Sequence, residues 1–422
     1  MTTKSRKRVV ILGAGSGGLT AALELERIFA TGAGLEITLV NQRNYHLFPP
    51  LLYQVVAGGI EPGHICFPVR SLLKHGGTMS PVTFRESQVE AIDLDRKMVA
   101  TDNGELQWDY LVVALGSTTN FFNLTETGGN AFPLKTMRDS IAIHNHILDS
   151  YETALLEPDA EHQRELLTFI IVGGGATGVE LVSAIQEFTS KVLPRNYPSI
   201  APEKVRVVLV EARDSVLHDM NHRLRKVALR HLRAQGVEVL LKTRISRLWP
   251  SGIQTEDGRT ISARTVIWVA GVKPVSLVEN LPLDKARDGR VIVDPYFSTP
   301  ALPEVYVIGD CAYLQREPRA ETFPPTGQMA VKGGLACARN IARVIRGKPQ
   351  EPFRYKYKGE LISMGRNAAV AQIGRYAFDG FPAWLVWRIY YLSKVMAFKN
   401  RLNIALDWSF AYFYQQNTAH LE

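Results

Sequence analysis

The amino-acid sequence predicts an α/β protein with two Rossmann-like units, the second inserted in the first, and amphipathic helices at its C-terminal end. Two glycine-rich turns of the same spacing, at residues 13–18 and 173–178, carry this prediction. Each turn lies between a short apolar run and a segment of small residues, which is the order strand, turn, helix. A third observation is the apolar run at 305–308, which ends abruptly at Gly309-Asp310 and marks the return to the first unit.

Both turns fit the pattern G-x-G-x-x-G. Their glycines are Gly13, Gly15, Gly17 and Gly18 in the first turn and Gly173, Gly175 and Gly178 in the second. In this pattern the first glycine makes a tight turn, the second lets the backbone approach a pyrophosphate, and the third allows close helix–strand packing. The pyrophosphate rests on the N-terminus of the helix. Two such turns in one chain predict two bound dinucleotides, and the usual reason for holding two is electron transfer between them.

The segments after each turn repeat in the same order. Apolar, β-branched runs occupy residues 9–12, 36–40 and 110–113 in the first half and 169–172, 205–210 and 265–269 in the second. Such unbroken runs suit strands that are buried on both faces, as in doubly wound parallel sheets. The last run of each set leads to a further glycine, Gly116 after Ala114 and Gly271 after Ala270. We therefore predict one parallel sheet in each unit.

Length and composition limit the possible classes of protein. A chain of 422 residues has room for two or three domains. Cys66, Cys311 and Cys337 are widely spaced, which fits a reducing compartment and argues against structural disulfides or a zinc site. The basic first eight residues lead directly into a strand, so no export signal is expected. The net charge of +8 favours anionic neighbours, and no nucleic-acid motif is present.

The composition changes from Phe381 onward. Aromatic and apolar residues recur there at helical spacing, at Trp384, Trp387, Tyr391, Val395 and Phe398. A membrane-spanning helix needs about 20 apolar residues with few charges, and basic residues interrupt this segment at Arg388, Lys394, Lys399 and Arg401. Aromatic bulk with basic residues is typical of a helix that lies in the membrane interface, attracted by anionic lipid. The alternative is a core or dimer helix, and the two are compatible.

Together these residues resemble the two-dinucleotide-binding-domain flavoproteins and, within them, the type II NADH dehydrogenases. Those are single-chain, non-pumping NADH:quinone oxidoreductases, and the resemblance runs from about residue 7 to residue 414. The first turn, Ala114–Gly116 and Gly309-Asp310 are shared by the whole superfamily. The more specific segments are Asn44-Tyr45-His46-Leu47-Phe48, Pro50-Leu51-Leu52-Tyr53-Gln54, Gly178-Val179-Glu180-Leu181, Gly309-Asp310-Cys311-Ala312, Phe398-Lys399-Asn400-Arg401-Leu402 and Asp407-Trp408.

The resemblance implies cofactors, domains and partners. It assigns FAD to the first turn and NADH, as substrate, to the second. The FAD-binding domain would comprise residues 1–120 and 285–375, the NADH-binding domain 121–284, and a membrane-associating region 376–422. The implied acceptor is a membrane quinone of a respiratory chain. The implied location is the cytoplasmic face of the cell membrane, as a peripheral protein on an anionic lipid surface and as a homodimer.

Residues at strand ends are candidates for binding the ribose groups. An acid at the end of the second strand takes ribose hydroxyls and repels a 2′-phosphate, so Glu211 favours NADH over NADPH despite the nearby Arg213. Asn41 holds the matching position in the first unit, and an amide can also bond a ribose hydroxyl. Asp310 lies at the sheet edge where ligands bind. The alternative is that Asp310 caps the following helix.

Three residues are candidates for the reaction itself. By resemblance, Glu180 faces the junction of nicotinamide and flavin; the alternative is a carboxylate favoured by the helix dipole. The family motif A-Q-x-A-x-Q lines the quinone pocket, and here Gln328 matches it while Lys332 replaces the second glutamine. The two share a helical face. Lys332 would stabilise reduced flavin or bond a quinone carbonyl, or else pair with a carboxylate or reach solvent.

Three other functions stay open at this point. An NAD(P)H-dependent reductase of a rubredoxin or ferredoxin fits the basic charge, because those partners are acidic, but such reductases usually lack an aromatic amphipathic tail. A sulfide:quinone oxidoreductase uses cysteines that flank the flavin, and none lies between Cys66 and Cys311. A non-catalytic flavoprotein that senses NADH would turn over slowly with every acceptor.

Overall fold

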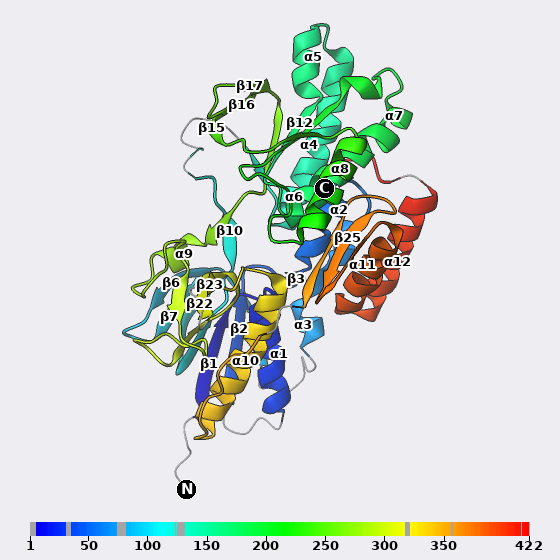
Figure 1. Ribbon diagram of the computed structural model, residues 1–422. Helices are drawn as coiled ribbons and strands as arrows, with labels where there is room; N and C mark the ends of the chain where they lie inside the picture. The colour runs from blue at the N-terminus through cyan, green and yellow to red at the C-terminus, as the bar shows by residue number, and fades with distance from the viewer. Residues whose placement is uncertain are drawn as a thin grey trace. The chain divides into compact units, whose positions relative to one another are not determined.

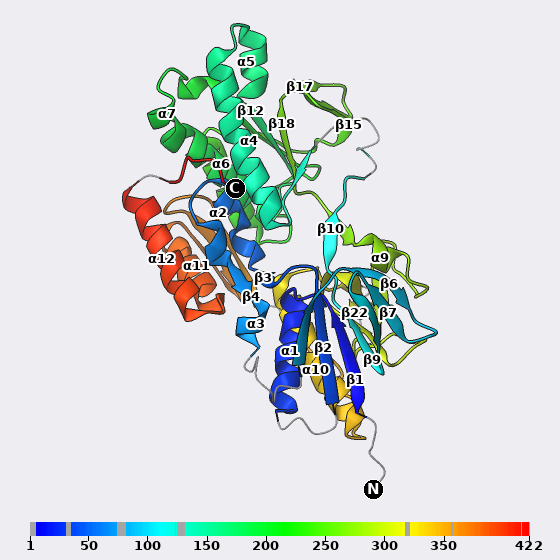
Figure 2. The same ribbon diagram turned by 180° about the vertical axis from the view of Figure 1, so that it is seen from behind.

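The computed structural model describes residues 6–30, 35–73, 82–122, 124, 131–316, 321–355, 358–414 and 416–421. The chain forms two compact units (Figures 1 and 2). Unit 1 comprises Met1–Leu47, Cys66–Thr118 and Val272–Lys356. Unit 2 comprises Phe48–Ile65, Thr119–Gly271 and Tyr357–Glu422. Each unit is therefore assembled from segments that are far apart in the sequence.

Unit 1 is built on a five-stranded parallel sheet. Its strand order is β21 (Val305–Val307), β9 (Tyr110–Val113), β1 (Lys7–Leu12), β2 (Leu35–Asn41) and β5 (Val82–Glu86). The strands place their apolar side chains in the core, since residues 9–12 of β1 are almost fully buried. Helices α1 (Ser16–Ile28) and α10 (Gly327–Ile345) pack side by side against this sheet (Figures 1 and 2).

Small elements complete unit 1. They are the antiparallel strands β6 (Val89–Asp93), β7 (Met98–Thr101) and β8 (Gly104–Gln107); the strands β20 (Val291–Val293), β22 (Ala312–Arg316) and β23 (Glu321–Thr322); the pair β3 (Tyr45–Leu47) and β4 (Cys66–Pro68); the strand β19 (Val272–Pro274); and the short helices α3 (Val69–Leu72) and α9 (Ser276–Glu279). The strand β10 (Ser117–Thr119) lies where the chain leaves this unit.

Unit 2 contains a second parallel sheet. Its strand order is β11 (Phe132–Pro133), β18 (Thr265–Trp268), β12 (Thr168–Val172), β13 (Arg206–Val210) and β14 (Glu238–Leu240). The antiparallel strands β15 (Ile245–Trp249), β16 (Gly252–Thr255) and β17 (Thr260–Ser262) share a core with it. Its helices are α4 (Met137–Leu156), α5 (Ala160–Leu166), α6 (Ala176–Glu187), a π-helical turn (Phe188–Val192), α7 (Leu193–Asn196) and α8 (His222–Ala234).

The C-terminal part of unit 2 is an antiparallel sheet followed by two helices. The sheet contains β24 (Gly359–Ser363), β25 (Ala369–Ile373) and β26 (Tyr376–Asp379). Helices α11 (Phe381–Lys394) and α12 (Phe398–Phe413) follow, drawn in orange to red in Figure 1. The short helix α2 (Leu52–Val56), flanked by single turns at Pro49–Leu51 and Pro62–Ile65, packs against α4 and α6.

The boundaries of the two units differ from the predicted domain boundaries. Residues 48–65 lie in unit 2 rather than with the first 120 residues, because the apolar side of α2 is buried against α4 and α6. Residues 357–375 also lie in unit 2, whereas 272–284 lie in unit 1. The fold class is confirmed: each of the six predicted runs forms a strand of a parallel sheet.

The C-terminal segment is helical, as predicted, and it forms two helices because the helical hydrogen bonding stops between Lys394 and Phe398. Most of the aromatic stripe faces inward: Trp384, Trp387 and Val395 are buried. The exposed apolar residues of these helices are instead Phe381, Leu385, Ile389, Phe398, Leu402, Leu406, Phe410 and Phe413. In the part of the chain that the structure describes, no helix is long and apolar enough to cross a bilayer.

Candidate functional site: two dinucleotide cradles and a buried carboxylate

The first glycine turn forms a compact cradle between β1 and α1. Gly13 has a φ of +100°, and its N–H donates to the carbonyl oxygen of Val40 at 2.7 Å. A Cβ at Gly18 would overlap the carbonyl oxygen of Gly13, whereas a Cβ at Gly15 would meet nothing within 4 Å. The middle glycine therefore borders open space beside the start of a helix, where a pyrophosphate fits.

Gly17 has a different role from its neighbours. A Cβ there would lie 3.3 Å from the carbonyl oxygen of Ala330 and from the side chain of Ile308. Gly334 of α10 lies still closer, since a Cβ there would overlap the Gly17 carbonyl oxygen. Gly17 was predicted to bind cofactor, but the structure places it where α1 packs against α10, and this packing by itself accounts for the glycine.

The other candidate FAD-binding residues gather at the carboxyl edge of the same sheet. The Asn41 side chain accepts a hydrogen bond from the Ala14 N–H at 2.9 Å and donates to the Arg43 carbonyl oxygen at 2.7 Å. The Asp310 carboxylate accepts a hydrogen bond from the Ser117 hydroxyl at 2.5 Å. Asp310 lies inside a single helical turn, Gly309–Cys311, so it is not the residue that caps it.

The glycines of these loops have conformations that other residues rarely adopt. Gly116 and Gly309 have φ angles of +76° and +69°. Ala114, just before that turn, donates its N–H to Leu12 of β1 at 2.8 Å. His46, which sequence reasoning left without a role, contacts the Ala14 carbonyl oxygen through Nδ1 at 2.8 Å. The only signal for His46 was its place in one of the family segments.

Unit 1 contains all three cysteines of the chain. Cys311 is buried, donates to the Gly116 carbonyl oxygen at 3.2 Å, and has a thiol pKa raised to about 12 by burial. Cys337 is also fully buried, and burial raises its pKa. Cys66 is half-buried, with a pKa raised to about 11, again by burial. All three are free thiols.

The second glycine turn repeats the first in unit 2. Gly173 has a φ of +111°, and its N–H donates to the Val210 carbonyl oxygen at 2.8 Å. A Cβ at Gly178 would overlap the Gly173 carbonyl oxygen, and a Cβ at Gly175 would again meet nothing within 4 Å. Gly271 has a φ of +75° and faces the ring of Phe122. The same cradle is therefore present in both units.

Glu211 holds this second turn from the end of β13. Its Oε2 accepts the Gly174 N–H at 2.6 Å, and its Oε1 accepts the Arg213 N–H at 2.7 Å. Each carboxylate oxygen has a second lone-pair direction, so both can still accept a ribose hydroxyl. Arg213 contributes its backbone N–H to the carboxylate, and no ion pair between the two side chains is found in the described residues.

Glu180 lies in the helix that follows the second turn and is 8% exposed. One carboxylate oxygen, Oε1, accepts both the Ser363 backbone N–H at 3.2 Å and the Trp387 indole N–H at 3.3 Å. Burial raises the pKa of the Glu180 carboxyl to about 8, against the effect of these two hydrogen bonds. Glu180 is beyond the first helical turn, so the helix dipole is not the reason for its position.

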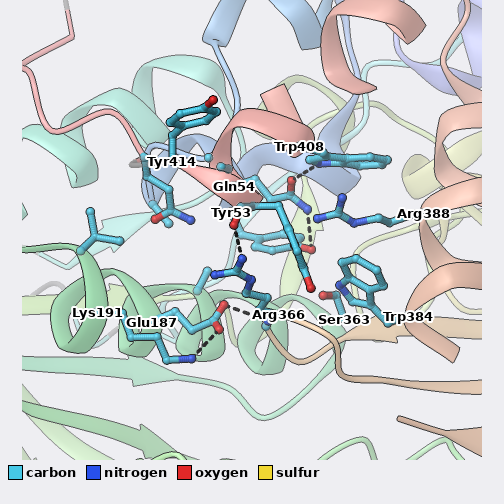
Figure 3. A pocket seen from close by; sticks show the side chains of 18 of the residues that line it. Tyr53, Gln54, Glu187, Lys191, Ser363, Arg366, Trp384, Arg388, Trp408 and Tyr414 are labelled. Atoms are coloured by element: carbon cyan, nitrogen blue, oxygen red, sulfur yellow. Dashed lines mark hydrogen bonds and ion pairs between the residues drawn. The ribbon is translucent and has the colours of Figure 1, made fainter. Parts of the chain in front are cut away.

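Unit 2 contains a pocket (Figure 3), and its lining includes Ser363 and Trp387, the two residues that donate to Glu180. The Trp408 indole N–H donates to Gln54 at 2.7 Å, and Gln54 donates to the Tyr53 hydroxyl at 2.9 Å. Burial, and then the nearby Glu180, raise the Tyr53 pKa well above its usual value. His64 and Asp407 also meet, at 2.6 Å. Two family segments, those of Gln54 and Trp408, are therefore in contact although they lie 354 residues apart in the sequence.

Gln328 and Lys332 lie on α10 in unit 1, whereas Glu180 lies in unit 2. The helix begins at Gly327, after Thr326, whose side chain accepts the Met329 N–H at 3.3 Å. Gln328 accepts a hydrogen bond from the Tyr355 hydroxyl at 3.1 Å. Lys332 is exposed and forms no ion pair or hydrogen bond with any described residue.

Comparisons with known proteins agree with this geometry. Residues 7–334 match the model of the pyridine nucleotide-disulphide oxidoreductases, and 357–416 match the NDH2 C-terminal domain. The type II NADH:quinone oxidoreductase Ndh of Mycobacterium tuberculosis is 33% identical, over 96% of this chain and 88% of the relative. The type II NADH:quinone oxidoreductase of Staphylococcus aureus is 30% identical, over 88% of this chain and 90% of the relative.

A solved structure has the same fold. The NDH2 of Plasmodium falciparum in complex with NADH covers 98% of this chain and 100% of its own, with a TM-score of 0.89 at 19% identity. Together the repeated cradle, the matched domains and the relatives leave one conclusion: the chain belongs to the type II NADH:quinone oxidoreductases, the non-proton-pumping flavoenzymes within the pyridine nucleotide-disulphide oxidoreductase family.

Proposed function

We propose that unit 1 holds FAD, that unit 2 holds NADH, and that the enzyme reduces a quinone dissolved in the membrane of a respiratory chain. The observation that carries the proposal is the repeated cradle, with open space at Gly15 and again at Gly175. FAD, when bound, takes a hydride from NADH and passes two electrons to the acceptor. The chain itself contributes binding, orientation and the placement of protons.

The nicotinamide substrate would be held by Glu211 and the second turn. Both carboxylate oxygens of Glu211 are already oriented by backbone N–H groups, which fixes them for the ribose hydroxyls. The negative charge opposes a 2′-phosphate, so NADH is the expected substrate. In unit 1, Asn41 and Asp310 would hold the ribose and ribityl side of FAD, with the phosphates at the start of α1.

Glu180 is proposed to hold a proton for the quinone. Oxidation of NADH by a quinone consumes one proton besides the hydride, so the site needs an acid near the acceptor. With a pKa of about 8, Glu180 is mostly protonated at neutral pH. Because both donors point at Oε1, its proton sits on Oε2. We assign Gln328 and Lys332 to the quinone carbonyl groups or to the negative charge of the reduced cofactor.

The exposed apolar side chains of α11 and α12 form the proposed membrane face. They include Ile389, Phe398 and Leu402, and the basic residues Lys394 and Lys399 lie in the same two helices. Apolar area combined with cations is the usual basis of interfacial binding to anionic lipid. Attachment at the cytoplasmic side and a homodimer formed through this region are proposed from the family resemblance.

The first test is steady-state oxidation of NADH, and separately NADPH, by the purified yellow protein with a short-chain ubiquinone or menaquinone and lipid. We expect turnover of tens per second or more, in the usual range of enzymes, with a clear preference for NADH. Fast reduction of the flavin without electron flow to any quinone would contradict the proposed acceptor. It would favour a reductase of an acidic protein, the alternative that the net charge of +8 supports.

The membrane face has its own test. Phe398→Ser and Leu402→Ser remove exposed apolar side chains and should weaken binding to vesicles that contain anionic lipid. Leu156→Ser, at the exposed end of α4, is the matched control and should leave binding unchanged. Equal binding by all three variants would mean that α11 and α12 do not form the attachment surface.

A further inference from the structure

The pocket of unit 2 carries more positive charge than its own residues neutralise. It encloses a volume of about 150 Å³ between α2, α6, the β24–β25 turn and the two C-terminal helices. Four cations line it, Lys191, Arg195, Arg366 and Arg388, against one carboxylate, Glu187 (Figure 3). Its other walls are mainly aromatic, with Trp384, Trp387, Trp408, Tyr412 and Tyr414. The motifs of the family do not account for this excess of cations.

Arg388 is the most unusual of the four. It is half-buried, with its guanidinium 4.0 Å from the ring centre of Trp384 and 4.9 Å from that of Trp408. Within the described part of the chain it forms no hydrogen bond and no ion pair. Burial lowers the pKa of Arg388 to about 10. A guanidinium has five N–H donors, and leaving them without acceptors away from water is costly.

The one carboxylate of the pocket is already engaged. Glu187 pairs with Lys191 at 3.0 Å and accepts the backbone N–H of Arg366 at 3.0 Å. The Arg366 guanidinium lies 3.9 Å from the ring centre of Tyr412 and donates to the Tyr412 carbonyl oxygen. Arg195 is exposed and has no ion pair among the described residues. The pocket therefore offers donors on two sides, and its one carboxylate is already paired with Lys191 and the Arg366 N–H.

We infer that this pocket binds the phosphate head group of an anionic phospholipid, with Arg388 and Arg366 donating to the phosphate oxygens. Arginine matches phosphate through paired hydrogen bonds. A volume near 150 Å³ accommodates about one benzene-sized group, so a phosphate with its first glycerol atoms fits and the acyl chains must lie outside. The exposed apolar residues Leu385 and Ile389 of α11 adjoin the pocket residues Trp384 and Arg388 in sequence and can carry the chains.

The charge distribution selects a phosphate over a neutral ligand. A quinone ring would use at most one or two donors and leave the excess cations uncompensated, whereas a phosphodiester offers several acceptors and a negative charge. This inference rests on the proposed attachment to a lipid surface and goes beyond it. It assigns one defined head-group site rather than a diffuse attraction, and that difference can be measured.

The experiment titrates the full-length yellow protein with short-chain phosphatidylglycerol below its micelle concentration and follows tryptophan fluorescence. Trp384 and Trp408 contact Arg388, so a bound head group should change their emission. We expect a saturable response to phosphatidylglycerol and none to short-chain phosphatidylcholine. Arg388→Gln should weaken binding about tenfold or more, the usual value of a charge-assisted hydrogen bond.

Matched variants separate this site from general surface charge. Arg230→Gln removes one exposed positive charge from α8 of the same unit, outside the pocket, and should change binding to the soluble short-chain lipid by less than about twofold. Equal losses in Arg388→Gln and Arg230→Gln would overturn the inference. Because Arg388→Gln could destabilise α11, Arg366→Gln and Arg388→Lys provide second variants, and both should weaken binding without loss of the yellow colour.

Two further titrations identify the ligand. Inorganic phosphate should compete only weakly, and equal affinity for phosphate and for the lipid would overturn the lipid assignment. Displacement of the lipid by a short-chain quinone would make this a quinone site and would also overturn it. Quinone turnover of the unmodified protein is measured in parallel. Turnover without a saturable lipid response refutes this inference alone, whereas absence of turnover refutes the proposed function.

Discussion

The two glycine turns have the same backbone but are held by different side chains. In both, the first glycine donates its N–H to the end of the neighbouring strand at nearly the same distance, 2.7 and 2.8 Å. In unit 1 the next residue of the turn donates to Asn41 at 2.9 Å, and in unit 2 it donates to Glu211 at 2.6 Å. A neutral amide and a carboxylate thus accept the same backbone hydrogen bond of the turn.

The comparison of Asn41 with Glu211 distinguishes support of the turn from selection of the nicotinamide cofactor. The turn needs an acceptor at the strand end, and either side chain supplies one. Only the carboxylate also carries a charge, which can discriminate between nicotinamide cofactors. A second difference lies two residues after the third glycine. Thr20 donates to the Ser16 carbonyl oxygen at 2.6 Å within its own helix, whereas Glu180 is buried under Ser363 and Trp387.

The largest expected effect comes from disrupting each cradle in turn. Gly18→Ala and Gly178→Ala both place a methyl group on a backbone oxygen, which should cost about 3 kcal/mol or more. Gly18→Ala should lose FAD and its yellow colour. Gly178→Ala should keep FAD but lose reduction by NADH, as followed by flavin absorbance.

Gly63→Ala is the control, because its Cβ would meet nothing within 4 Å and its φ is not in the left-handed region. It should behave as the unmodified protein. Loss of FAD from Gly178→Ala with FAD retained in Gly18→Ala would reverse the assignment of the two units.

The next effect concerns the buried carboxylate of unit 2. Because the folded pKa of Glu180, about 8, exceeds the ordinary glutamate value of 4.5, its contribution to stability is complete below about pH 4.5 and is lost as pH rises through 8. The loss is on the order of a few kcal/mol. Unfolding temperatures measured from pH 5 to 9 should fall more steeply for the unmodified protein than for Glu180→Gln. Parallel curves would show that Glu180 is ionised in the folded protein.

Trp387→Phe is a second test of the raised pKa of Glu180. It removes one of the two N–H donors to Glu180, with little change in volume, so the pKa of Glu180 should rise further. Glu360 also raises the pKa of this carboxyl, and Glu360 is unchanged in the variant. The pH profile of quinone reduction should shift upward by about one unit. Trp384→Phe, which contacts Arg388 instead, should leave the profile in place.

Replacing the strand-end acid tests the source of selectivity. Glu211→Gln keeps an acceptor for the Gly174 N–H but removes the charge. The preference for NADH over NADPH, measured as the ratio of kcat/KM values, should fall by about tenfold, equivalent to about 1.4 kcal/mol. An unchanged ratio would mean that shape, not charge, excludes the 2′-phosphate.

The smallest effect is expected at Thr20. Thr20→Ala removes a hydrogen bond within α1 that competes with the helix backbone. Stability should change by less than about 0.5 kcal/mol, and the pH profile should not move. A shift in the profile would show that the residue two positions after the third glycine affects the pH dependence in both units.

Part of this protein was determined by its sequence alone. The glycine turns, the parallel strands and the start of α10 at the Gln328 motif depend on local patterns, namely apolar runs, glycine spacing and a capping threonine. Such patterns act over a few residues and do not depend on what packs against them. The family segments include Gln54 and Trp408, but their sequence positions did not show that the two side chains are in contact.

Only the tertiary structure decided which faces are buried. The periodicity of the C-terminal segment was visible in the sequence, but Trp384 and Trp387 could equally have faced lipid or core. The buried state of Glu180 depends on Ser363 and Trp387, which lie 183 and 207 residues away in the sequence. The surroundings of Arg388 likewise depend on distant segments, because its guanidinium lies against Trp408 of the next helix and, among the described residues, has no hydrogen-bond acceptor. Helical spacing shows which residues share one face of the helix. Whether that face is buried depends on the free energy gained when distant segments pack against it.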